Sequence, residues 1–117
     1  FNKAGKDDAP LENTCNLLRS VSGEGADVVI ITARDESCRK RTLKWLRLND
    51  VPCDTLLMRG INDTRSDAIV KKHLFDDKFL KLYDFKDVWF VLEDRVTCVD
   101  MWRGEGLTCF QVAPGDY

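Results

Sequence analysis

Apolar runs alternate with stretches of helical periodicity along the whole chain of 117 residues. The apolar, β-branched runs predict strands over 27–32, 55–59 and 107–112, and a further strand in the apolar part of "VWFVLEDR" from residue 88. Apolar residues at helical spacing predict helices over 10–22, 36–48 and 66–75, a helical turn over 78–83 and a helix from residue 96. This order favours an α/β fold with a Rossmann-like parallel sheet and helices on both of its faces.

The boundaries of two of these helices have local signals. Asp8 and Pro10 are typical of a cap and a first turn, so we expect the first helix to begin at Pro10. In the last helix Val96, Val99 and Trp102 fall on one face, and the glycines at 104 and 106 can terminate it.

Length and composition limit the possible classes of protein. The length is typical of one domain over residues 1–117. Lys plus Arg number 18 and Asp plus Glu 20, so the net charge of −2 excludes a globally basic nucleic-acid coat but allows a local basic face. The five cysteines are scattered without a C-x-x-C pair, which favours reduced thiols in a core over a zinc site or disulfides. Without a long apolar run or a signal peptide, we expect a cytoplasmic protein without membrane spans.

Polar residues follow the C-terminal ends of the predicted strands. Right-handed crossovers make these strands parallel, so we expect the residues at their ends to gather along one edge of the sheet: Thr32, Arg34, Arg59, Glu93 and Asp94. Two adjacent carboxylates at a dry strand end repel each other unless a cation compensates them. The sequence therefore predicts a cation beside Glu93 and Asp94.

Four segments at these boundaries carry a family resemblance: "VIITARDES", "NDTRSDAIVKKHLF", "VLEDRVTCVDMWRGEG" and "TCFQVAPGDY". In this order they resemble motifs of the haloacid dehalogenase (HAD) superfamily of phosphatases. Within that superfamily they are most similar to the C-terminal 3′-phosphatase domain of bacteriophage polynucleotide kinase. The resemblance covers nearly the whole chain and implies a HAD-like fold, magnesium as cofactor and a phosphorylated nucleotide or nucleic-acid end as substrate.

The resemblance also implies roles for residues that contact the phosphoryl group, whose negative charge requires donors and cations. Thr32 would donate its hydroxyl and backbone N–H to that group. Lys71 would neutralise the charge shared by that group and the nucleophile, with Asp67 one turn earlier to hold the lysine. Arg34 and Arg59 would grip the substrate through their forked guanidinium groups.

The acidic pair would form the metal site. Asp94 would be a magnesium ligand, and Glu93 either a second ligand or a residue that orients a coordinated water. A magnesium ion and Lys71 together would offset the repulsion between the two carboxylates.

Simpler interpretations remain open for the cationic residues. Arg34 beside Asp35 and Glu36 could belong to a solvated loop, and Lys71 with Asp67 could be a surface ion pair. Arg65 and Arg95 favour a structural or surface role over a catalytic one. The helix over 36–48 has a cationic outer side, which is either a solvated face or a track for a nucleic-acid backbone: Arg39, Lys40, Arg41, Lys44 and Arg47.

The superfamily's first motif, D-x-D-x-T at the end of a first strand, has no counterpart in the chain. Asp7 and Asp8 follow "FNKAGK" rather than an apolar run, and Asp27 lies at the start of its strand. We therefore expect an N-terminally truncated domain that lacks its nucleophile and its central first strand. Upstream residues, a partner chain or dimer, or direct pairing of the flanking strands would have to fill that gap.

The function that this pattern favours is a magnesium-dependent phosphomonoesterase that acts on 3′-phosphates through an aspartyl-phosphate. Because the nucleophile is missing, we expect the 117 residues alone to be inactive. Two alternatives remain: an inactive remnant that still binds phosphate or nucleotide, and a receiver-like interaction domain with a similar acidic edge.

Overall fold

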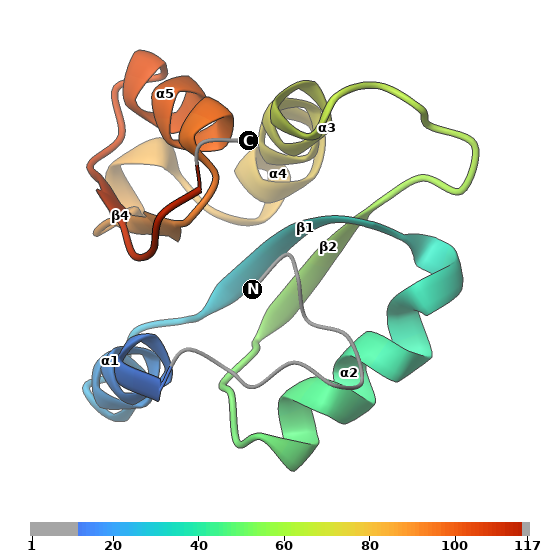
Figure 1. The fold of residues 1–117 in the computed structure, drawn as a ribbon. Helices are drawn as coiled ribbons and strands as arrows, with labels where there is room; N and C mark the ends of the chain where they lie inside the picture. Colours follow the sequence, from blue (N-terminus) through green and yellow to red (C-terminus); the bar gives the residue numbers. More distant parts are fainter. Residues whose placement is uncertain (1–11, 116–117) are drawn as a thin grey trace. The chain divides into compact units, whose positions relative to one another are not determined.

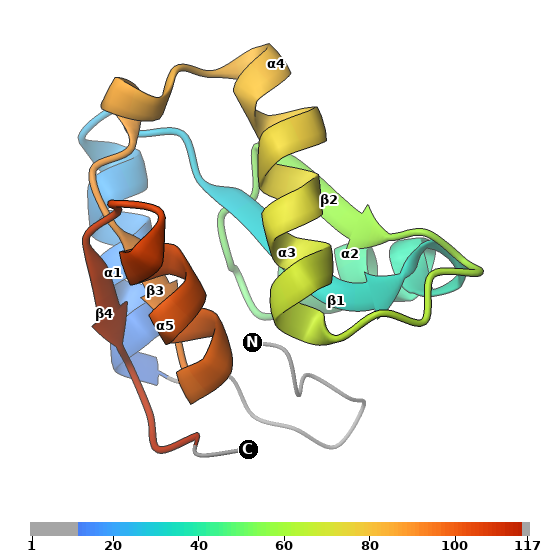
Figure 2. The same ribbon diagram turned by 90° about the horizontal axis from the view of Figure 1, so that it is seen from above.

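A computed structural model of the protein describes residues 12–115 (Figures 1 and 2). The chain divides into two compact units, Phe1–Asn62 and Asp63–Tyr117. Each unit contains a two-stranded parallel sheet and helices of its own. The expectation of a single domain remains a prediction, because compactness alone does not show whether a unit folds independently. The predicted cap at Asp8 and Pro10 lies outside the described residues.

The first unit is a helix followed by a β-α-β crossover (Figure 1). Its elements are α1 (Glu12–Gly23), β1 (Val29–Asp35), η1 (Glu36–Cys38), α2 (Arg39–Leu48) and β2 (Thr55–Arg59). The strands are parallel, with Val29 opposite Thr55 and Thr32 opposite Met58. The predictions of a helix, a strand, a helix and a strand in this half of the chain are confirmed.

Strand β1 continues past the residue at which the sequence predicted its end. Regular pairing with β2 stops at Thr32 and resumes only at Asp35, which lies opposite Arg59. The Asp35 carboxylate then accepts a hydrogen bond from the backbone N–H of Ser37 (2.9 Å) and a second from the Ser37 hydroxyl, and so caps η1. These bonds, chiefly the one from the hydroxyl, lower the pKa of Asp35.

Helices α1 and α2 form the core of the first unit together with the loop that precedes β2. Cys15, Leu46 and Val51 are buried at its centre, and four partly buried residues pack against them: Leu18, Ile30, Trp45 and Cys53. Arg19 in α1 donates to the backbone oxygens of Asn49 and Asp50, which ties the end of α2 to α1. The three central residues of β1 that precede Thr32 are only partly buried, contrary to the expectation of a fully covered strand. A sheet two strands wide is too narrow to cover them completely.

The second unit begins with one continuous helical segment, seen in yellow-green to yellow in Figure 2. It consists of α3 (Asp67–Leu74), the π-helical turn η2 (Phe75–Phe79) and the short α4 (Leu80–Leu82). Phe75 and Phe79 stack with their ring centroids 4.9 Å apart, and Phe75 also meets Trp102 edge to face. The predicted helix over 66–75 and turn over 78–83 are therefore parts of a single segment.

The rest of the second unit is η3 (Phe85–Asp87), β3 (Val91–Glu93), α5 (Val96–Gly104) and β4 (Cys109–Gln111). Strands β3 and β4 are parallel, and α5 lies beside β4 in both views (Figures 1 and 2). Val99 and Trp102 are buried on the inner face of α5, as their spacing predicted. Only Gly106, with φ of +89°, uses the left-handed conformation at the end of α5; Gly104 is still helical.

Strand β3 is shorter than the apolar run that predicted it. Val88, Trp89 and Phe90 precede the strand instead of belonging to it, and Trp89 is 62% exposed. The ladder with β4 spans only Val91 to Glu93, so the preceding residues have no strand to pair with in the described part of the chain. The apolar composition of the run is therefore not a sign that all of it is buried.

The two sheets bear on the expectation of a missing central strand. Within residues 12–115, β1 pairs only with β2, and β3 pairs only with β4. Direct pairing of the two flanking strands, one of the three ways to fill the gap, is therefore not what the described residues do. Three of the five cysteines, Cys15, Cys98 and Cys109, are buried as expected of core thiols. None of the helices in the described range is both long and apolar enough to cross a bilayer.

Candidate active site

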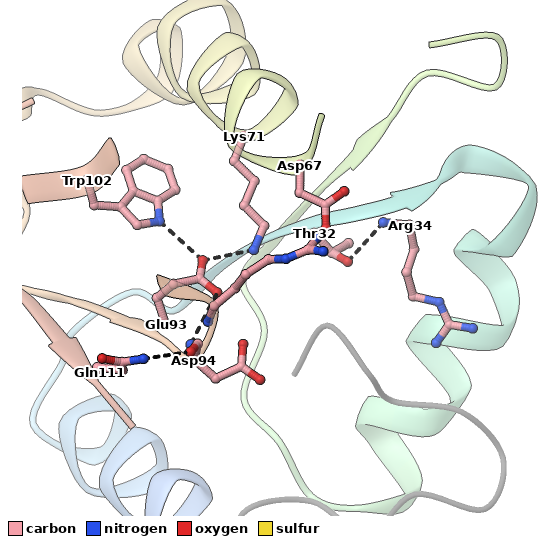
Figure 3. Close-up of polar contacts among 9 residues, drawn as sticks. Thr32, Arg34, Asp67, Lys71, Glu93, Asp94, Trp102 and Gln111 are labelled. Carbon is pink, nitrogen blue, oxygen red and sulfur yellow. Dashed lines mark hydrogen bonds and ion pairs between the residues drawn. The ribbon is translucent and has the colours of Figure 1, made fainter. Parts of the chain in front are cut away.

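A buried ion pair lies at the end of β3. The Lys71 Nζ atom on α3 is 2.8 Å from Glu93 Oε1, and the two side chains are only 1% and 5% exposed (Figure 3). The predicted cation beside the acidic pair is therefore Lys71. The open alternative that Lys71 belongs to a solvated surface pair is wrong, because its side chain is enclosed.

Glu93 is held by four donors. Its Oε1 also accepts a hydrogen bond from the Trp102 indole N–H on α5 (3.3 Å), as Figure 3 shows. Its Oε2 accepts from the backbone N–H groups of Asp94 (3.2 Å) and Arg95 (3.3 Å). A carboxylate that is charge-paired and hydrogen-bonded on both oxygens is fixed in orientation.

The backbone of Asp94 is held by the segment that follows β4. Gln111 donates a side-chain hydrogen bond to the Asp94 backbone oxygen (3.0 Å), and the Val112 N–H donates to the Glu93 backbone oxygen (3.0 Å). Gly115 packs directly on the Asp94–Arg95 peptide, where a Cβ would overlap the Asp94 backbone oxygen. The position of the buried Asp94 side chain thus depends on the C-terminal segment.

Asp67 has a different partner from the one that its spacing predicted. Its carboxylate forms an ion pair with Arg95, which follows the acidic pair, while Lys71 turns to Glu93. The expectation that Asp67 holds Lys71 is therefore corrected. Side chains four residues apart on a helix are neighbours, but a buried carboxylate from β3 offers Lys71 a drier and closer partner.

The remaining candidate residues belong to the first unit. Thr32 is buried, and its hydroxyl accepts a hydrogen bond from the Arg34 backbone N–H (3.2 Å). In Figure 3 the Arg34 side chain points away from Thr32. Arg59 donates from Nε to the Ala33 backbone oxygen (2.7 Å), so Thr32, Arg34 and Arg59 gather where β1 and β2 end.

Arg34 and Asp35 lie within β1 and are half-buried, so the alternative of a solvated loop does not apply to them. Arg65 pairs with Asp63 (2.7 Å) and Arg95 with Asp67, which fits the structural role expected of both arginines. Whether the cluster around Thr32 and the cluster around Glu93 form one site remains a prediction.

Sequence analysis missed three residues of the second cluster: Trp102 as a donor to Glu93, Arg95 as the partner of Asp67, and Gly115 against Asp94. Trp102 was assigned only to the apolar face of α5. Its indole N–H was the available signal, since a buried tryptophan usually finds an acceptor.

The geometry defines the class first: an α/β domain with a Thr-ended strand, a helix lysine and an acidic pair after a later strand, as in HAD-type phosphatases. Comparison with known families supports this class. Residues 2–117 match the family model of the polynucleotide kinase PNKP phosphatase domain. The chain therefore belongs to this family.

Solved structures show the same fold. A chain of the Pnkp1/Rnl/Hen1 RNA repair complex is 36% identical with a TM-score of 0.87, and the match covers 95% of this chain and 35% of that chain. A second structure of the Pnkp1/Rnl/Hen1 complex is also 36% identical, with a TM-score of 0.86 and coverage of 95% and 38%. The chain thus spans little more than a third of the length of these relatives, and its HAD-like fold is confirmed.

Proposed function

We propose that the protein is a magnesium-dependent phosphomonoesterase that removes the 3′-phosphate from a nucleic-acid end or nucleotide through an aspartyl-phosphate. The observation that carries this proposal is the buried Lys71–Glu93 pair, with Asp94 directly after it, in a chain of the PNKP phosphatase family. Similarity to chains of RNA repair complexes supports a nucleic-acid end as the substrate class.

The roles proposed for the chain's own residues follow from their environments. Thr32, with its hydroxyl at the end of regular β1 pairing, would donate to the phosphoryl group, and Arg34 and Arg59 would bind the substrate. Lys71 would balance negative charge near the phosphoryl group while Glu93 fixes its ammonium group. Asp67 would act indirectly by holding Arg95.

A magnesium ion would fit Asp94 better than Glu93. Both Glu93 oxygens already accept hydrogen bonds, which favours the role of an orienting residue over that of a direct ligand. Within residues 12–115, no three His, Cys, Asp or Glu side chains converge in a way that could hold a metal. One carboxylate is nevertheless a plausible protein share for Mg²⁺, which keeps several waters and binds substrate phosphate oxygens. Bound there, the ion would supply charge stabilisation for the phosphoryl group.

The proposed nucleophile lies outside these residues. No D-x-D spacing occurs anywhere in the 117 residues, so the aspartate would come from upstream residues or from a partner chain that adds a strand. A cytoplasmic location remains a prediction.

The test measures phosphate release from 3′- and 5′-phosphorylated oligonucleotides. We expect none from the 117-residue chain. A version extended at its N-terminus by a strand with D-x-D-x-T should release only the 3′-phosphate, only with magnesium, and not after Asp94→Asn. Activity of the unextended chain that disappears with Asp94→Asn would show that the nucleophile lies within it and would contradict the assignment above.

A second candidate is an inactive phosphate-binding remnant of the same fold, favoured by the missing D-x-D spacing. It predicts that the 117-residue chain binds a 3′-phosphorylated nucleotide, and that the extended version binds it without turnover. The receiver-like alternative has no further support, since the chain belongs to a phosphatase family.

A further inference from the structure

Helix α2 presents a row of cations to solvent. Lys40, Lys44 and Arg47 recur at helical spacing along one side of α2, with Arg41 beside them, and all are exposed. None of these four side chains has an ion-pair or hydrogen-bond partner in the described part of the chain. Arg39 differs, because it binds Glu36 and the Leu56 backbone oxygen and belongs to the fold.

The lack of acidic partners sets this face apart from the other exposed cations. Lys72 is paired with Asp76 and Glu105, and Arg65 with Asp63. Like charges at neighbouring helical positions destabilise a helix slightly, so an uncompensated row carries a small cost that an anionic ligand would remove.

The row follows from the candidate phosphate-binding end of the first unit. Helix α2 begins just after Asp35, close to the edge where Thr32 and Arg34 lie, and runs back toward the start of β2. At about 1.5 Å of rise per residue, Lys40 and Arg47 are separated by roughly 10 Å along the axis. That length matches about two phosphates of an extended strand rather than a single anion.

A groove adjoins the far end of the row. Arg47 lines it together with Leu43, Leu46, Val51, Pro52 and Cys53, beside Asp50, and its volume is about 440 Å³. Burial raises the pKa of the Cys53 thiol, so the wall that it contributes is neutral. Apolar walls beside a cationic side chain suit an unpaired base whose phosphate is held outside.

We propose that the outer face of α2 and this groove bind a single-stranded nucleic acid, with backbone phosphates on Lys40, Lys44 and Arg47 and a base against Leu43. The inference rests on the proposed function for its substrate class, and it names single-stranded ends as the preferred form. A duplex would offer phosphates to the row but no unpaired base to the groove.

The experiment measures binding of a fluorescein-labelled oligouridylate with a 3′-hydroxyl end, by anisotropy at several salt concentrations. Lys40→Gln/Lys44→Gln/Arg47→Gln should weaken binding and reduce the slope of log K against log salt by about 2, or about 0.7 for each lost phosphate contact. The matched control Lys78→Gln/Lys81→Gln/Lys86→Gln removes the same charge from exposed positions of the second unit and should leave the slope unchanged.

A further variant tests the groove separately. Leu43→Ser should lower the affinity several-fold without changing the salt slope, because it removes an apolar contact and no charge. Leu43 is already 41% exposed, and far-UV circular dichroism would verify the fold of each variant.

Equal salt slopes for the two triple variants would overturn the proposal, as would failure of the unmodified protein to bind oligouridylate. Preferential binding of polyglutamate would assign the face to an acidic protein and would also overturn it. Because the probe carries no 3′-phosphate, these results do not depend on turnover. Failure to release phosphate in the earlier test would leave this binding result intact.

Discussion

Lys71 and Glu93 form an almost completely enclosed ion pair, 2.8 Å apart, that joins helix α3 to the end of strand β3. Two charges removed from water are tolerated only when each satisfies the other. The pair therefore fixes α3 against β3 at the position where the acidic pair of the candidate site begins.

Lys71→Met should destabilise the protein by about 3–5 kcal/mol, because it leaves the Glu93 carboxylate buried without its counter-charge. Urea unfolding would measure the loss. Lys71→Met/Glu93→Gln should recover part of it, since no uncompensated charge remains. Lys72→Met is the matched control: its pairs with Asp76 and Glu105 are about half exposed, so its cost should stay below about 1 kcal/mol. Equal losses for Lys71→Met and Lys72→Met would contradict the importance given to the buried pair.

Trp102→Phe should cost about 2 kcal/mol through loss of the indole N–H bond to Glu93 and of buried ring area. The measurement is again urea unfolding, alone and combined with Glu93→Gln. Because both changes act on the same oxygen, their effects should not add. Trp45→Phe, which removes an indole with no acceptor in the described residues, should cost less. Strict additivity of Trp102→Phe and Glu93→Gln would argue against the hydrogen bond.

Local patterns predicted most of the elements and the need for a cation. The periodicity of 36–48 and 66–75 reports one buried face of a helix, and the compensation argument at Glu93 and Asp94 depends only on adjacent like charges. Both signals are contained in short stretches of chain. For that reason α2, α3 and the cationic partner of Glu93 were predictable.

Tertiary choices were not predictable in the same way. The spacing of Asp67 and Lys71 suits an ion pair, but it cannot show that Glu93 from another element competes for the lysine. The apolar residues 88–90 read as a strand, yet the short partner β4 limits β3 to Val91–Glu93. The clusters around Thr32 and around Glu93 also follow from the strand ends, while their convergence remains a prediction.

Gly115→Ala should destabilise the second unit and displace the Asp94–Arg95 peptide, because the new Cβ overlaps backbone atoms that cannot rotate away. We expect a loss of more than about 1 kcal/mol, as for other overpacked sites. Thermal unfolding and amide hydrogen exchange near Asp94 would measure both effects. Gly104→Ala is the control: nothing lies within 4 Å of its Cβ position at the end of α5, so it should be neutral or slightly stabilising. A neutral Gly115→Ala would contradict the close packing of the C-terminal segment on Asp94.

Burial raises the pKa of the Cys109 thiol to about 11, from an ordinary value of 9.0. Between these values the unfolded chain loses the proton that the folded chain keeps, so the free energy of unfolding should fall as the pH rises through this window. The loss attributable to Cys109 should approach about 2 kcal/mol near pH 11. Urea unfolding from pH 8 upward would measure it, and Cys109→Ala should flatten the dependence although it lowers stability at every pH. Cys38→Ala, at a partly exposed site, is the control and should leave the dependence unchanged. A slope that Cys109→Ala does not alter would show that other groups cause the alkaline loss.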